Sequence, residues 1–146
     1  MSFKIRRATP PDFESIHALN KEFAQFIKTP EKFKITVEQM HEEQGHFCIL
    51  VAENEAGEII GFATTFIAWY SWTGKTMYLD DLYIIEKYRG NGLGSDFLDE
   101  VIAMAKAQKC KKVKWQVSRW NKNAIEFYKS RGAEIDDVDI NCDLAL

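Results

Sequence analysis

Proline and cysteine are both scarce in this sequence, with three residues of each among 146. The cysteines, Cys48, Cys110 and Cys142, are odd in number and show no CxxC spacing. We therefore expect reduced, mostly buried thiols rather than a disulfide framework or a zinc site. The three histidines also lie far from any cysteine or acidic cluster with the spacing of metal ligands, so no bound metal is expected.

A strong excess of one charge is also lacking. The 19 basic and 22 acidic residues give a net charge of -3, without the basic face that nucleic-acid binding requires. No apolar run reaches the roughly 18 residues of a membrane span, so a membrane partner is not expected. The first residues, MSFKIRRATPPDF, lack the apolar core of a secretory signal, which predicts a cytoplasmic protein.

The composition that remains is that of an ordinary globular domain, with 46% hydrophobic and 28% charged residues. Its length fits a single domain over residues 1–146. Hydrophobic spacing and turn signals predict strand, two helices, three strands, helix, strand, helix and strand, at residues 3–8, 13–26, 36–45, 46–53, 59–70, 76–85, 93–104, 113–117, 121–132 and 135–144. This order indicates an α/β fold with a mixed sheet covered by helices.

A glycine-rich segment, Arg89-Gly90-Asn91-Gly92-Leu93-Gly94, lies between a predicted strand and a predicted helix. Glycines at alternate positions let backbone N–H groups point toward one spot, and the start of the helix favours a bound phosphate or pyrophosphate. A turn without a ligand is the alternative. The Gly-Lys-Ser/Thr ending of nucleotide-triphosphate loops is missing, and the glycine spacing disfavours a dinucleotide-binding module.

Two adjacent acids, Asp80 and Asp81, interrupt an otherwise apolar strand. Burying an ionised carboxylate without a partner is costly, so the pair needs a reason. The two side chains point to opposite faces unless a bulge redirects one of them. Either the acids are structural and one pairs with a base such as Arg7 or Lys75, or they perform acid–base chemistry beside the glycine loop.

Several segments resemble the GNAT superfamily of acetyl-CoA N-acetyltransferases, and its diamine (spermidine/spermine) and thialysine branch in particular. The resemblance is carried by Tyr78-Leu79-Asp80-Asp81, by the glycine loop, and by Trp120-Asn121 with Phe127-Tyr128-Lys129-Ser130-Arg131-Gly132-Ala133. It implies a GNAT-like, mixed and mostly antiparallel sheet of six to seven strands with about four helices on its faces. That sheet opens between the strands at 76–85 and 113–117, and the coenzyme lies in the gap.

The resemblance also implies an acetyl-CoA site. The backbone of Leu82, Tyr83 and Ile84 is expected to pair with the pantetheine arm, and the later helix is expected to line the arm's other side. The residues implied in coenzyme binding are Leu82, Tyr83, Ile84, Arg89, Gly90, Asn91, Gly92, Leu93, Gly94, Ser95, Asn121, Asn123, Ala124 and Tyr128.

The catalytic roles follow from the same resemblance. Asp80 matches the group that takes the proton of the amine, and Asp81, Trp72 and Phe26 are expected to contact the substrate. The family more often has Glu at the first acid, and the shorter Asp favours a water relay. Tyr128 matches the general acid that protonates the departing thiolate, although an aromatic residue on a helix face is often only packing.

Two positions depart from the diamine branch, because Tyr70 and Ile27 stand where that branch has acids. A diamine or a lysine- or thialysine-like amine therefore competes with a long polyamine as substrate. The branch implies a homodimer. The alternatives are an acetyltransferase for another amine, such as an amino acid, an aminoglycoside or a protein N-terminus, and a non-catalytic sensor of acyl-CoA or polyamine.

Overall fold

The computed structural model describes residues 2–146 and has an α/β fold. The described chain divides into two compact units, one ending at Gln116 and the other beginning at Val117. No helix in the described part of the chain is long and apolar enough to cross a membrane.

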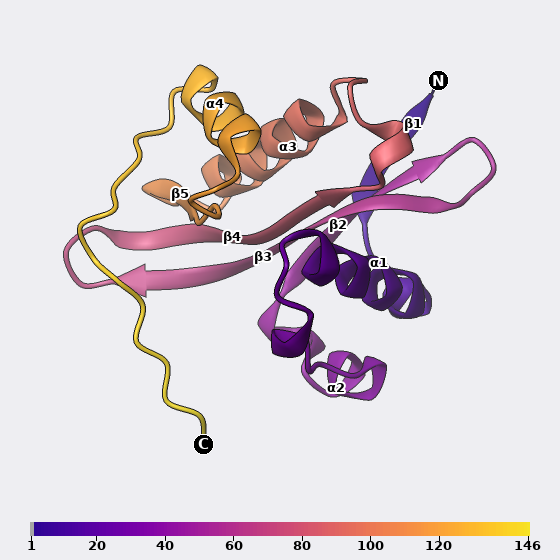
Figure 1. The fold of residues 1–146 in the computed structure, drawn as a ribbon, viewed down its shortest axis with the longest axis horizontal. Helices are drawn as coiled ribbons and strands as arrows, with labels where there is room; N and C mark the ends of the chain where they lie inside the picture. Colours follow the sequence, from indigo (N-terminus) through magenta and orange to yellow (C-terminus); the bar gives the residue numbers. More distant parts are fainter. Residues whose placement is uncertain (1) are drawn as a thin grey trace. The chain divides into compact units, whose positions relative to one another are not determined.

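The first unit contains one five-stranded sheet, with the strands in the order of the sequence (Figure 1). Neighbouring strands are antiparallel except for the last pair, in which β5 runs parallel to β4. The strands are β1 (Phe3–Arg7), β2 (Cys48–Asn54), β3 (Ile59–Tyr70), β4 (Gly74–Ile84) and β5 (Lys112–Trp115). The two longest strands, β3 and β4, form an antiparallel pair at the centre of the sheet order, and the glycine loop follows the carboxyl end of β4.

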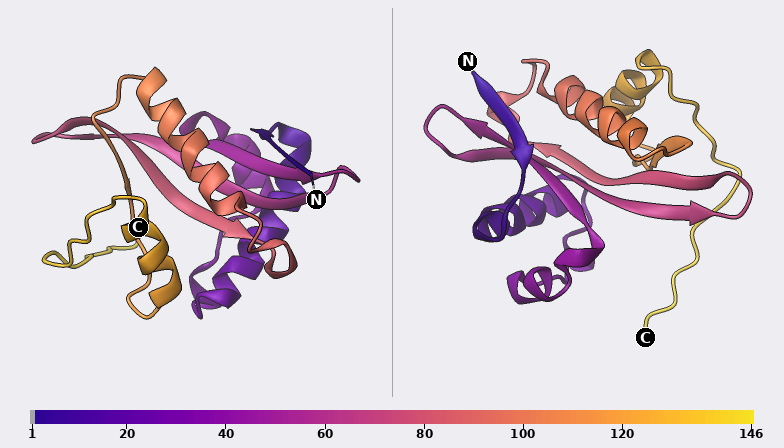
Figure 2. Two further views of the ribbon diagram at one scale, coloured as in Figure 1. Left: turned by 90° about the horizontal axis from the view of Figure 1, so that it is seen from above. Right: turned by 180° about the vertical axis from the view of Figure 1, so that it is seen from behind.

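Helices cover both faces of this sheet (Figure 2). The helices α1 (Phe13–Phe26) and α2 (Val37–Glu42) lie on one face, and α3 (Leu93–Ala107) lies on the other. On the α1 face, side chains of α1 pack with those of β2, β3 and β4 in a core of Phe13, Ile16, Leu19, Met40, Ile49, Val51, Phe62 and Tyr83. Phe62 and Ala63, neighbours whose side chains point to opposite faces, are both fully buried, so both faces are covered around the middle of β3.

Local capping interactions set the start of the first two helices. The Thr36 hydroxyl accepts a hydrogen bond from the Gln39 N–H, and the Gln39 side chain accepts one from the Thr36 N–H. Before α1, the Asp12 carboxylate accepts from the Thr9 N–H and from the Arg6 guanidinium. The same Arg6 also pairs with Glu53 of β2, so the start of α1 is tied to the sheet.

The second unit contains one helix, α4 (Lys122–Ser130), which makes four α-helices in the described chain. The Asn121 side chain caps α4 by accepting a hydrogen bond from the Ala124 N–H. At its other end Gly132 has a φ of 90°, a left-handed conformation that suits glycine after a helix.

The prediction of six to seven strands is wrong, because the segment from Ile135 to Leu144 forms no strand. Its apolar side chains are left open to solvent, with Val138, Ile140 and Leu144 between 83% and 88% exposed. The segment alternates apolar residues with acids, as an edge strand does, but among the described residues it finds no strand to pair with.

The expected burial of the cysteines is also only partly met. All three are free thiols, but Cys48 and Cys110 are half-buried and Cys142 is exposed. Cys142 lies in the segment that forms no strand, so the burial expected from that strand is lost.

Candidate active site

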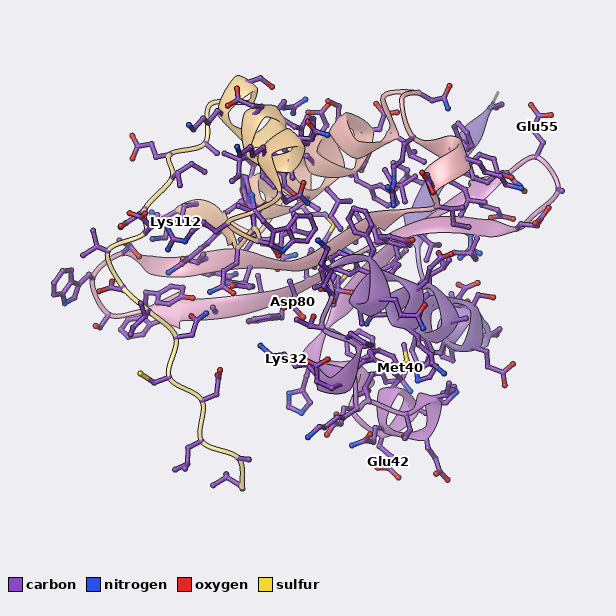
Figure 3. The ribbon with its side chains drawn as sticks, in the orientation of Figure 1. Lys32, Met40, Glu42, Glu55, Asp80 and Lys112 are labelled. Carbon is purple, nitrogen blue, oxygen red and sulfur yellow. The ribbon has the colours of Figure 1, made fainter. Side chains whose placement is uncertain are left out.

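The acids of β4 lie at a β-bulge. Thr64 of β3 is opposite Asp81 and the next residue, Thr65, is opposite Leu79, so Asp80 is the extra residue in β4. A bulge breaks the alternation of the strand and turns adjacent side chains toward one face. The bulge thereby turns Asp80 and Asp81 toward one face of the sheet. Asp80 lies on the side of the sheet that carries α1 (Figure 3).

Neither acid is neutralised by a protein partner. Within residues 2–146 neither carboxylate makes a hydrogen bond or ion pair, and the Lys75 ammonium donates instead to the carbonyl of Gln108. Burial, together with the negative charge of Asp80, raises the pKa of the Asp81 carboxyl to about 7. Asp80 is exposed by surface area, yet partial desolvation also raises its pKa. The geometry therefore does not support the purely structural interpretation of this pair.

Aromatic side chains form a floor beside the acids. The rings of Phe66 and Tyr78 are stacked with centroids 5.0 Å apart. Desolvation raises the pKa of the Tyr78 phenol, and the charges of Asp80, Tyr70 and Asp81 raise it further, which shows that all three groups lie within electrostatic reach of Tyr78. A carboxylate pair beside flat aromatic rings suits an ammonium group on an aliphatic stem.

The sheet opens directly next to the acids. Pairing between β4 and β5 ends where Leu79 meets Trp115, and no other described strand covers this edge of β4. The Ile85 N–H donates to Ile60 of β3. Because backbone groups of alternate residues point to opposite sides of a strand, Leu82 and Ile84 direct theirs to the open edge. Tyr83 instead directs its backbone toward β3, so only two of the three predicted backbone contacts are available at that edge.

The glycine loop follows the open edge and leads into α3. Gly90 and Gly92 have φ values of 83° and 78°. Apart from the glycine itself and its two chain neighbours, no atom lies within 4 Å of where a Cβ would be at either position. Gly92 is the N-cap of α3 and has no side chain to satisfy the first N–H groups of the helix, including those of Leu93 and Gly94. Asn91 stabilises the turn by donating its side-chain amide to the carbonyl of Tyr88. The loop thus offers an open, positively polarised helix start to an anion.

The first residue of the loop, Arg89, contacts α1 and β4. The Arg89 guanidinium lies over the rings of Phe26 and Tyr83, 4.7 Å and 5.3 Å from their centroids, and its Nε–H donates to the carbonyl of Ile84. A pocket of about 490 Å³ lies at this contact, and it is lined by Glu22, Phe26, Tyr83, Ile85, Glu86, Lys87 and Arg89. Burial and a hydrogen bond with Glu22 raise the pKa of Tyr83 to about 12. Glu22 is a site residue that the sequence analysis missed, although it lies one helical turn before Phe26.

Other predicted residues lie elsewhere in the structure. Trp72 is 97% exposed at the turn between β3 and β4. Gly74, where β4 begins after that turn, is six residues before Asp80, or about 20 Å at 3.3 Å per residue. The chain therefore does not bring Trp72 to the acid pair. Asn121, Asn123, Ala124 and Tyr128 belong to the second unit, where burial raises the pKa of the half-buried Tyr128 phenol.

Residues 13–133 match the profile of the Acetyltransferase (GNAT) family, which covers well over half of the chain. The chain belongs to this family. Mouse thialysine N-epsilon-acetyltransferase is 31% identical over 144 residues, which cover 91% of this chain and 85% of the relative. Human spermidine/spermine N(1)-acetyltransferase-like protein 1 is 30% identical over 90% of this chain and 20% of its own length. A GNAT-like fold is also found in an aminoglycoside acetyltransferase from a soil metagenomic sample, with a TM-score of 0.81, 16% identity, and 99% and 100% of the two chains covered.

As a GNAT protein, this chain is an acyltransferase, and GNAT acetyltransferases use acetyl-CoA as cosubstrate. The open edge of β4 and the empty space around Gly90 and Gly92 fit an extended, anionic coenzyme of that kind. No group of three potential metal-binding side chains occurs in residues 2–146.

Proposed function

We propose that this GNAT protein transfers the acetyl group of acetyl-CoA to a primary amine of a small cationic molecule. The observation that carries the proposal is the bulge in β4, which puts two unpartnered carboxylates beside the open edge of the sheet. The names of its relatives, for thialysine and for spermidine/spermine, support an amine with a second charged group as the acceptor.

The coenzyme arm extends along the open edge of β4 in this proposal. Leu82 and Ile84 supply the backbone groups that pair with it, and the loop from Gly90 to Ser95 holds the pyrophosphate through N–H groups and the α3 dipole. The Ile84 carbonyl already accepts from Arg89, so that hydrogen bond must break or be shared on binding. Coenzyme roles for Asn121, Asn123 and Ala124 rest on the family resemblance alone.

The acid pair prepares the amine for attack. A primary amine of pKa near 10 is protonated at neutral pH, and its ammonium form has no lone pair. Asp80, the more exposed acid, takes this proton through a water molecule, while Asp81 holds and orients the ammonium. Desolvation raises the pKa of both carboxyls above the ordinary value of an aspartate, which suits proton transfer at physiological pH.

The amine nitrogen then attacks the thioester carbonyl carbon, the new C–N bond forms, and the C–S bond breaks. The nitrogen loses its second proton to solvent, which leaves a neutral amide. The family resemblance alone assigns the protonation of the departing thiolate to Tyr128, whose phenolate then recovers a proton from solvent. A thiol with a pKa near 8.5 is a fair leaving group without help, so this protonation contributes less than the removal of the amine proton.

The resemblance further supports a homodimer. Two largely exposed indoles lie at this end of the sheet, Trp69 near the end of β3 at 72% and Trp72 in the β3–β4 turn at 97%, and such exposure is unusual on a monomer surface. In a dimer this turn is available to a second copy of the chain, which would give Trp72 a role that it lacks within one chain.

Release of free thiol from acetyl-CoA, measured with a panel of amines, tests the proposal. We expect turnover with small diamines or amino acids that carry a side-chain amine. Asp80→Asn should lower kcat by about 10²- to 10⁴-fold with coenzyme affinity unchanged, and Tyr128→Phe should lower it less. Thiol release that is independent of amine, or an Asp80→Asn variant with full activity at neutral pH, would contradict the proposed chemistry.

A further inference from the structure

Two lysines of β5 face the same side of the sheet as the acid pair. In the parallel β4–β5 register Lys112 is opposite Thr76 and Lys114 is opposite Tyr78. Tyr78 shares its face with Phe66, whose ring it stacks on, and with Tyr70, which lies within its electrostatic reach.

Both ammonium groups gather on one aromatic ring. Lys114 Nζ lies 4.6 Å from the centroid of Tyr70, and Lys112 Nζ lies 5.5 Å from it. Neither lysine forms an ion pair with a carboxylate in the part of the chain that the structure describes. Two like charges held side by side without an anion repel each other, so an anion placed there is favoured by both.

The lysines form the far end of a strip that begins at the acids. Lys114 is opposite Tyr78 in the register of β4 and β5. Tyr78 is three residues before Asp81, so the two positions are about 10 Å apart along β4 at 3.3 Å per residue. The stacked rings of Phe66 and Tyr78 lie between the two charged ends. Figure 3 shows Asp80 near the middle of β4 and Lys112 on β5, toward the β3–β4 turn.

We infer that Lys112 and Lys114 form a subsite for a carboxylate at the far end of the acceptor amine. The subsite rests on the proposed function, since the reacting ammonium is the one that the acid pair holds. An acceptor that fits both ends has an ammonium and a carboxylate about 7 Å apart, the span of six bonds of about 1.5 Å in an extended chain. This is the geometry of an amino acid with a side-chain amine, such as lysine. A diamine would instead place a second cation beside two lysines.

The inference also gives a role to Tyr70, which stands where the resembling branch has an acid. Here the position offers a ring that holds two cations rather than a charge that attracts one. The charge at the far end of the acceptor site is therefore positive where the branch has a negative one, and repulsion between like charges disfavours polyamines.

Lysine and cadaverine test the subsite, because cadaverine is lysine without its carboxylate. We expect the wild-type protein to use lysine with a higher kcat/KM than cadaverine. The double variant Lys112→Gln/Lys114→Gln should lower kcat/KM for lysine by about 10- to 100-fold, the size of one or two charged contacts, and leave cadaverine unchanged or improved. Lys111→Gln, which removes an exposed charge from the same basic run, is the matched control and should change neither value.

Two results would overturn the subsite: a wild-type preference for cadaverine, or an equal loss on both amines in the double variant. If the wild type acetylates neither amine, the proposed function fails on this panel. Calorimetric binding then still decides about the subsite, because lysine must bind the wild type more tightly than it binds the double variant. Equal binding of lysine to the two proteins would remove the inference.

Discussion

Asp81 should make the folded protein less stable as the pH rises through neutrality. Its pKa is about 7 in the folded protein, against an ordinary value of 3.8 that we take for the unfolded chain. Between these values the folded state binds more protons than the unfolded state, so stability falls with rising pH. The loss begins above the lower pKa and is complete above the higher one.

The size of the effect follows from these two values. The linkage relation gives a loss of about 2.5 kcal/mol in the free energy of unfolding between pH 5 and pH 8, as an upper limit for a side chain that solvent partly reaches. Asp81→Asn removes the titrating group, so most of this pH dependence should disappear. The variant should then be more stable than the wild type at pH 8, although its activity falls.

Urea unfolding of both proteins at pH 5 and pH 8 measures this difference. Glu55→Gln is the control, because it removes a carboxylate that is exposed in the turn between β2 and β3 and should keep the wild-type pH dependence. If the wild type and Asp81→Asn lose the same stability between the two pH values, within about 0.5 kcal/mol, the carboxyl is not desolvated as the structure indicates.

Two glycines give further predictions. Gly92→Val should reduce coenzyme affinity at least tenfold by calorimetry, because a β-branched residue is strained at a φ of 78°. Gly92→Asn should largely retain binding. Equal affinity in both folded variants would show that the loop does not need this conformation. Gly61→Ala should cost about 1–3 kcal/mol in urea unfolding, because its Cβ would lie 3.0 Å from the Tyr83 carbonyl oxygen. Gly45→Ala, with no atom within 4 Å of the added Cβ, should cost much less, and equal losses at the two sites would contradict the packing described for β3.

The order of the helices and of the five strands was predictable because local sequence signals set it. Only the sixth predicted strand is not formed. The capping pair Thr36–Gln39 and the Asn121 cap act within one helical turn, and β3 covers the predicted residues 59–70. The glycine loop is equally local, so its position after a strand and before α3 follows from the sequence.

The chemistry of the site depends on contacts between distant segments, and these could not be predicted. The position of the bulge is set by the register of β4 against β3, which decides that Asp80 and Asp81 share a face. The hydrogen bond of Glu22 with Tyr83 and the lysines over Tyr70 join elements far apart in the sequence. The sequence beyond Ala133 has the alternation of a strand, but it pairs with no strand of the described chain, and periodicity alone does not reveal this.

Transfer of an isotope-labelled acetyl group from acetyl-CoA to an amine tests the central claim most directly. The account predicts that purified protein, incubated with the labelled coenzyme and lysine, forms lysine with the label in an amide on its side-chain nitrogen. Asp80→Asn should form this product at least a hundredfold more slowly with its coenzyme affinity intact. Label that stays on the coenzyme, or a product formed as fast by Asp80→Asn as by the wild type, would contradict the account.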